Sequence, residues 1–132
     1  MTRVRTLAGE TGGATAVEFA LTAPMFMALV WGIIEVGLGL WTQFGLENAV
    51  EAAARCASVN TKTCTGSSTI ATYAASQTMG VTIASSAFTF SKVSCGNQVS
   101  ASYSFAYLTS VFHAPSVTLA AQACFPDINV GG

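Results

Sequence analysis

Side chains that could perform acid–base or nucleophilic chemistry are scarce in this sequence. Only 8% of its 132 residues are charged, and His113 is the single histidine. Beyond residue 57, Asp127 is the only acidic residue, and Lys62 and Lys92 are the only basic ones. Neither a carboxylate pair nor a base beside a nucleophile can be assembled from them, and no phosphate-binding glycine motif is present. We therefore expect no enzyme activity and no cofactor.

Four cysteines, Cys56, Cys64, Cys95 and Cys124, are the remaining candidates for covalent or metal chemistry. They contain no C-x-x-C pair, and the chain has one histidine, which argues against a zinc site. All four follow a long apolar segment; if that segment spans a membrane, they lie on the outer, oxidising side. An even number there predicts two disulfides, with three possible connectivities. We favour Cys56 with Cys64, clipping a helix end to the next loop, and Cys95 with Cys124, joining the ends of the first and last strands.

The apolar segment upstream of these cysteines is long enough to cross a bilayer. Sixteen uncharged residues separate Glu18 from Glu35, and the apolar character resumes as "VGLGLWTQFGL" up to Glu47. A helix rises about 1.5 Å per residue, so the first block covers about 24 Å, and the run to residue 46 about 42 Å, against a hydrocarbon core of about 30 Å. The sequence therefore predicts a single membrane-spanning helix with apolar length to spare.

The distribution of basic residues predicts how this helix is oriented. Arg3 and Arg5 precede the apolar run, and no basic residue follows until Arg55. This asymmetry places the N-terminus inside and the rest of the chain outside. A cleaved secretory signal peptide is the alternative, but the run is too long for its apolar core. With so few basic residues, we expect no nucleic-acid partner.

A short motif at the start of the apolar run resembles the site cut by prepilin peptidases. In "GATAVEF", Gly13 precedes Ala14, and Glu18 stands at the fifth position after the glycine. The longer stretch from Gly12 to Ala57 is similar to the TadE-like family, including its "AVEFAL", "GIIE" and "AAAR" pieces. Downstream of it, only the layout of cysteines, short strands and a closing "VTLAAQACF" is similar.

This resemblance implies a minor pilin or pseudopilin of a Tad-type pilus or secretion system. It implies cleavage after Gly13, with Gly12 and Gly13 keeping the chain extended for the peptidase, and Ala14 as the new N-terminus. Glu18 would then neutralise an N-terminal amine during subunit docking. The alternative role for Glu18 is a charge that complements the positive end of the helix dipole, worth about 0.3–1 kcal/mol.

The partners implied are other pilin subunits, the Tad inner-membrane assembly platform, the prepilin peptidase and membrane lipid. The location implied is the bacterial inner membrane, crossed once with the C-terminal domain in the periplasm, and a surface pilus after assembly. The alternative function is an unprocessed, bitopic inner-membrane adaptor or binding module with a periplasmic domain.

Several residues within the apolar helix suggest contacts with other helices. Ala28 and Gly32 form a small-xxx-small step, which lets helix backbones approach closely, and Pro24 is expected to kink or locally open the helix. Glu35 would either hydrogen-bond a neighbouring helix or lie at the outer headgroups. The candidate packing positions are Pro24, Ala28, Gly32, Glu35, Gly37 and Gly39. Apolar side chains expected to project beyond the bilayer and to need cover from another chain are Leu38, Leu40, Trp41, Phe44 and Leu46.

The second half of the helix has one apolar face and one polar stripe. Helical spacing places Leu46, Val50, Ala53 and Ala57 on the apolar face. Glu47, Glu51 and Arg55 form the polar stripe, in which Glu51 and Arg55 are spaced for an i,i+4 ion pair. We expect one continuous stem helix over residues 14–57, half of it packed on a small domain.

The remaining residues predict a small outer domain. A short helix within "STIATYAASQTMG" would be capped by Ser67 or Ser68 and stopped by Gly80. Three strands follow, within "VTIASSAFTFSKVSC", "VSASYSFAYL" and "SVTLAAQACF", the first broken near Ser85 and Ser86. Gly96 and Asn97 would form the first turn, and "TSVFHAP" the second connection.

These elements predict an α+β protein. Its parts are a leader (1–13), a transmembrane and stem helix (14–57), and a small disulfide-linked extracytoplasmic domain (58–132). In that domain a short helix and a three-stranded antiparallel sheet pack on the stem.

Overall fold

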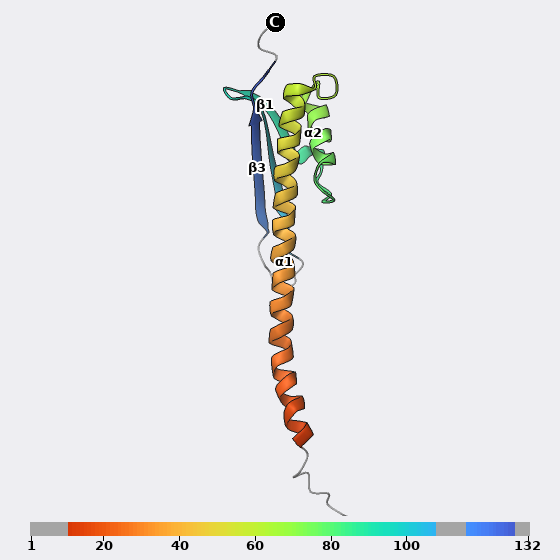
Figure 1. Cartoon of the computed structure of the whole chain (residues 1–132), viewed down its shortest axis with the longest axis vertical. Helices are drawn as coiled ribbons and strands as arrows, with labels where there is room; N and C mark the ends of the chain where they lie inside the picture. The colour runs from red at the N-terminus through yellow and green to blue at the C-terminus, as the bar shows by residue number, and fades with distance from the viewer. Residues whose placement is uncertain (1–10, 108–115, 129–132) are drawn as a thin grey trace, which may run out of the picture. The chain divides into compact units, whose positions relative to one another are not determined.

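The computed structural model describes residues 11–107 and 116–128, with side chains from Gly13 onward. Its elements follow one another as a long helix, a short helix, a single 3₁₀ turn and three strands (Figure 1). Their bounds are α1 (Thr11–Val59), α2 (Ser67–Ser76), η1 (Ser85–Ala87), β1 (Phe88–Val93), β2 (Gly96–Phe105) and β3 (Val117–Phe125). The predicted α+β class is confirmed. Arg3, Arg5 and His113, with the connection that holds it, lie outside the described residues.

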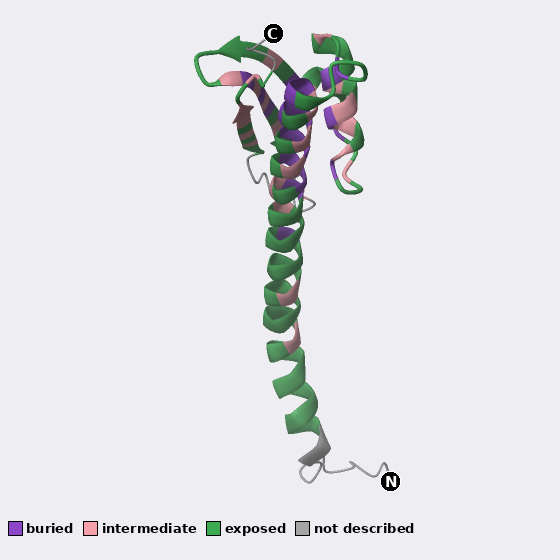
Figure 2. Cartoon of the chain, turned by 45° about the horizontal axis from the view of Figure 1, so that its top comes forward, coloured by how far each residue is buried: buried purple, intermediate pink, exposed green. Residues whose placement is uncertain are grey.

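Helix α1 is apolar enough to cross a membrane over Gly13–Val59, and none of its most apolar window is buried inside the chain. That exposure distinguishes it from the core helix of a soluble protein (Figure 2). The helix begins at Thr11, so the expectation that Gly12 and Gly13 are extended is wrong. Glycine keeps its backbone N–H, so it can join a helix at a cost in conformational entropy of about 0.5–1 kcal/mol relative to alanine.

Contacts divide the chain into two compact units, residues 1–36 and residues 37–132. The first contains the N-terminal part of α1, and the second contains the rest of α1 together with α2 and the sheet.

The sheet of the second unit is an antiparallel meander in the order β1-β2-β3. Strand β1 pairs with β2 from Phe88↔Ala101 to Val93↔Gly96, and β2 pairs with β3 from Asn97↔Phe125 to Phe105↔Val117. The first turn is therefore formed by Ser94 and Cys95, two residues earlier than predicted. Gly96 begins β2 with φ +123°, a conformation that favours glycine, and a Cβ there would overlap the Phe125 carbonyl oxygen.

The core of this unit forms where the apolar face of α1 meets the sheet and α2 (Figure 2). The predicted face is confirmed, since Val50, Ala53 and Ala57 are all buried. Leu46 was also expected to be exposed, which is wrong, because it is fully buried in the core. Leu46 lies four positions before Val50, a little over one helical turn, so both side chains point to the same side of the helix. The other core members are Ala49, Ala54, Cys64, Ile70, Ala74, Ile83, Phe88, Val99 and Ala101.

The polar stripe of α1 is exposed, as its spacing predicts. The predicted ion pair between Glu51 and Arg55 is not formed; in the described part of the chain, the ion pair present joins Lys92 to Asp127. Glu47 instead accepts a hydrogen bond from Gln43 Nε2 at 2.8 Å. Exposed charges in water gain little from pairing, which explains why the spacing alone did not decide the partner.

Helix α2 is capped differently from the prediction. Its N-cap is Gly66, and the Thr69 hydroxyl accepts from the Gly66 N–H at 3.0 Å and donates to the Gly66 carbonyl at 2.8 Å. The helix ends at Ser76, before Gly80. Ser67 and Ser68 are therefore the first helical residues, and the Thr69 hydroxyl joins the first turn to the backbone of Gly66.

Two disulfides close the unit. Cys56 is bonded to Cys64, which ties the end of α1 to the following loop, with a Cα–Cα distance of 5.9 Å. Cys95 is bonded to Cys124, which ties the β1–β2 turn to the end of β3, with a Cα–Cα distance of 6.3 Å. This is the favoured of the three connectivities that the sequence leaves open.

Candidate functional site

The residues of the predicted cleavage motif lie in the first turns of α1. Gly13, Ala14 and Glu18 are all exposed, and a Cβ built on Gly13 would meet no atom within 4 Å. Ala14 and Glu18 are four residues apart on one helix, so their Cα atoms lie about 6 Å apart on the same face. A free amine at Ala14 would thus be within reach of the Glu18 carboxylate of its own helix.

The helix that follows this motif presents apolar side chains on every face. Phe19 is 72% exposed, and Met25 is 79% exposed. Other exposed large apolar residues before Gly37 are Val17, Leu21, Phe26, Met27, Leu29, Trp31, Ile33, Ile34 and Val36. A helix that is apolar all round requires lipid or other protein around it, because water is a poor solvent for so much contiguous apolar surface.

The Thr22 hydroxyl, close to Pro24, is satisfied within its own helix. Pro24 lies inside α1 without ending it, although proline removes one N–H from the helical ladder. Near it, the Thr22 hydroxyl lies 3.0 Å from the Glu18 carbonyl and 3.3 Å from the Phe19 carbonyl. Such back-bonding lets a threonine remain in an apolar helix without an unsatisfied hydroxyl.

The candidate packing positions fall into two groups. Ala28, Gly32 and Gly37 are exposed, and a Cβ on either glycine would meet no atom within 4 Å. These positions leave room for a neighbouring helix. By contrast, a Cβ on Gly39 would lie 3.7 Å from the Phe105 ring, and Glu35 is buried, with 7% of its surface exposed.

Apolar side chains also project from α1 in the second unit. As expected from the spare apolar length of the helix, four of these side chains are between 42% and 66% exposed: Leu38, Leu40, Trp41 and Phe44. Gly45, in the same stretch of α1, is where the helix comes close to the turn after α2. A Cβ on Gly45 would lie 2.7 Å from the Thr78 carbonyl oxygen. Sequence reasoning did not single out Gly45, since nothing local distinguishes it from the other glycines of this segment.

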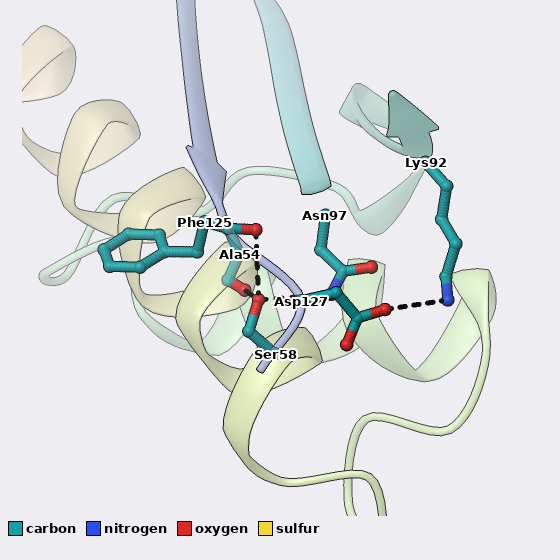
Figure 3. Close-up of polar contacts among 6 residues, drawn as sticks. All are labelled: Ala54, Ser58, Lys92, Asn97, Phe125 and Asp127. Atoms are coloured by element: carbon teal, nitrogen blue, oxygen red, sulfur yellow. Dashed lines mark hydrogen bonds and ion pairs between the residues drawn. The ribbon is translucent and has the colours of Figure 1, made fainter. Parts of the chain in front are cut away.

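Sequence reasoning also missed a buried polar cluster that joins α1 to β2 and β3 (Figure 3). Asn97 and Ser58 are each 2% exposed. Asn97 Nδ2 donates to Ser58 Oγ at 3.1 Å, and Ser58 Oγ lies 3.1 Å from the Ala54 carbonyl and 3.3 Å from the Phe125 carbonyl (Figure 3). Continuing the alternation of β2 backward from Val99 would have placed Asn97 on the inner face. The cluster holds three elements together and contains no group suited to proton transfer.

The other polar groups of the described residues include one ion pair at the surface. The Lys92 ammonium lies 3.2 Å from the Asp127 carboxylate at the end of the sheet, with the lysine side chain 71% exposed (Figure 3). Among residues 11–107 and 116–128, no group of three histidine, cysteine or acidic side chains is placed to hold a metal ion.

Comparison with protein families matches the N-terminal part of the chain. A family model described as TadE-like protein matches residues 13–55, which is 43 of the 132 residues. No curated protein and no solved structure matches the chain. The matched stretch runs from the cleavage motif through the exposed apolar helix to the face that packs on the sheet. Over residues 13–55, this chain is therefore similar to the TadE-like family.

Proposed function

We propose that this chain is a minor pilin or pseudopilin of a Tad-type pilus or secretion system. In this proposal, a prepilin peptidase cleaves it after Gly13, and the mature subunit assembles through the N-terminal part of α1. The observation that carries the proposal is the exposed, apolar helix that follows "GATAVEF" within the TadE-like match.

The exposed surface of α1 is suited to two apolar environments, a lipid bilayer and a fibre of packed helices. Large apolar side chains cover the helix before Gly37, and small residues at Ala28, Gly32 and Gly37 leave open space beside its backbone. In a bilayer, lipid tails would cover this surface. In a fibre, neighbouring helices would cover it, and close approach at the small residues would add van der Waals contact. The same surface thus serves membrane storage and assembly.

The charge on Glu18 is explained by the same proposal. Cleavage creates an amine at Ala14, and both charges become poorly solvated once helices bundle. An unpaired charge in such surroundings costs several kcal/mol, whereas a paired one costs much less. Pairing Glu18 with the amine of a neighbouring subunit would favour the docked state, and pairing within one helix would only lower the cost of burial.

We further propose that the unprocessed chain spans the bacterial inner membrane once, with Arg3 and Arg5 inside and the domain of residues 58–132 in the periplasm. Both disulfides agree with an oxidising compartment for that domain. The partners would be other pilin subunits, the inner-membrane assembly platform, the prepilin peptidase and membrane lipid.

N-terminal sequencing of the chain purified from membranes tests the cleavage. We expect Ala14 as the first residue when a prepilin peptidase is present. Gly13→Val should block processing, because the small residue before the scissile bond is lost, while the folded domain is unchanged, since nothing lies within 4 Å of that position. Gly32→Val is the matched control: it makes the same substitution in equally open space and should be cleaved normally.

An intact leader on the wild-type chain beside an active peptidase would reject the proposal. It would favour instead an unprocessed bitopic adaptor, whose outer domain holds a partner in the envelope.

A further inference from the structure

The outer edge of β3 is the longest unpaired strand edge in the described part of the chain. Strand β3 pairs with β2 on one side, and within the described residues no strand pairs with its other side. Its nine residues, Val117–Phe125, include no charged residue and no proline. The opposite edge strand, β1, is shorter and carries Lys92. Long uncharged edges are templates for strand pairing, and proteins normally protect them with charges, prolines or cover.

One hydrogen bond shows which backbone groups of β3 point outward. Gln43 Nε2, on α1, donates to the Ala120 carbonyl at 3.1 Å. In an antiparallel strand the N–H and C=O of one residue point to the same edge, and the direction alternates along the chain. The outward groups beyond Ala120 therefore belong to Gln122 and Cys124.

Helix α1 carries two carboxylates beside these outward groups. Gln43, Glu47 and Glu51 are four residues apart and form one stripe, which rises about 6 Å per step. Two residues of a strand rise about 6.7 Å. Since Gln43 bonds to Ala120 and Ser58 lies beside Phe125, α1 and β3 run in the same direction. Glu47 and Glu51 thus line the same groove as Gln122 and Cys124.

A groove separates the stripe from the strand. Its volume is about 550 Å³, and it is lined by Glu47, Val50 and Glu51 on the helix and by residues 120–125 on β3. No basic side chain lines it. The Gln43 amide donates both to Glu47 and to the Ala120 carbonyl, which holds the first carboxylate toward the strand edge.

We propose that this groove docks an extended segment of a partner protein that carries two basic residues two positions apart. The segment adds to the sheet through the outward N–H and C=O groups of Gln122 and Cys124. Its lysine or arginine side chains, spaced about 6.7 Å apart on one face, contact Glu47 and Glu51. This mode combines strand addition with charge complementarity.

A second copy of this chain fits the groove less well. Pairing two β3 edges would bring no cation to Glu47 or Glu51, because β3 contains no basic residue. The proposal concerns the unit of residues 37–132 and does not depend on cleavage after Gly13, so the two proposals can fail independently.

Peptide titration of the full chain tests the docking. The oxidised, ¹⁵N-labelled protein in detergent micelles is titrated with an amidated peptide of about seven residues, in which two lysines two positions apart are flanked by threonine and valine. We expect chemical-shift changes centred on the Gln122 and Cys124 amides. A peptide with glutamates in place of the lysines should not bind. Replacing both Glu47 and Glu51 by glutamine should weaken binding by roughly threefold to thirtyfold, as expected for two exposed ion pairs.

Gln122→Pro tests the backbone contact. It removes an outward N–H without removing a bond to β2, and should weaken binding roughly tenfold. Gln122→Ala keeps the N–H and loses the same side chain, so it should bind like the wild type. Methylating the peptide nitrogens that face β3 gives a test on unaltered protein and should abolish binding.

The proposal is overturned by equal binding of the lysine and glutamate peptides, by equal binding to the proline and alanine variants, or by tight binding of the methylated peptide. It is also overturned if shifts at Gln122 depend on protein concentration alone, which would indicate pairing between two copies.

Discussion

The contact between Gly45 and the Thr78 carbonyl makes a specific prediction for Gly45→Ala. The added methyl carbon would lie 2.7 Å from the Thr78 oxygen, 3.4 Å from the Thr78 carbonyl carbon and 3.8 Å from Val81 Cγ2. The first distance is far inside van der Waals contact, and the atom that it meets belongs to the backbone. Relief therefore requires α1 or the turn to shift.

The magnitude follows from two opposing effects. Overpacking a tight contact costs about 1–3 kcal/mol, and replacing glycine by alanine inside a helix gains about 0.5–1 kcal/mol. Asn48 Nδ2 donates to the neighbouring Gln77 carbonyl at 3.0 Å and resists the shift that would relieve the overlap. We expect a net loss of about 1–2 kcal/mol in the free energy of unfolding, which lowers Tm by roughly 5–15 °C for a domain of this size.

Thermal unfolding of the full, oxidised chain in detergent, followed by near-UV circular dichroism, measures this loss. Gly37→Ala is the matched control: it makes the same change in the same helix, but nothing lies within 4 Å, so Tm should stay constant or rise slightly. If Gly45→Ala is as stable as the Gly37 variant, α1 does not approach Thr78 closely, and the reasoning is refuted.

Three further predictions concern assembly, the buried polar cluster and the disulfides. Glu18→Ala should still be cleaved but absent from surface fibres, as judged by immunoblotting of sheared filaments; normal incorporation would reduce Glu18 to a helix-end charge. Asn97→Ala should lower the free energy of unfolding by about 1–3 kcal/mol, because Ser58 loses a buried donor. The double variant with Ser58→Ala should lose less than the sum of the two single-variant losses. Additive losses would disprove coupling between the two side chains. Replacing the Cys95–Cys124 pair with serines should lower the free energy of unfolding by about 1 kcal/mol more than replacing Cys56–Cys64, as measured by thermal unfolding. The reason is that it opens the longer loop, with a sequence separation of 29 against 8 residues. Equal losses, or a larger loss for Cys56–Cys64, would show that loop entropy does not set how much each disulfide stabilises the fold.

Local patterns in the sequence predicted most of the architecture. The absence of charge between Glu18 and Glu35 indicates an apolar helix, and that helix is present and exposed. The alternation of "VSASYSFAYL" predicts a strand with one inner face, and Val99 and Ala101 are buried on it. Such periodicities are visible because neighbouring residues on one element share one environment.

Element ends were predicted less well. The cap of α2 is Gly66 with Thr69 rather than Ser67 or Ser68, and the first hairpin turn precedes Gly96. At these positions several polar or small residues stand in a row. Which of them forms the turn depends on the pairing register with β2, and local preference alone does not determine it.

The sequence by itself determined the kind of elements, their order and the exposed apolar helix, because each depends on residues close together in the chain. Tertiary structure decided the burial of Leu46, the need for glycine at Gly45, and the partner of Asn97. It also placed Glu47 and Glu51 beside the open edge of β3. These features depend on atoms contributed by residues far apart in the chain, and only packing of α1 against α2 and the sheet brings them together.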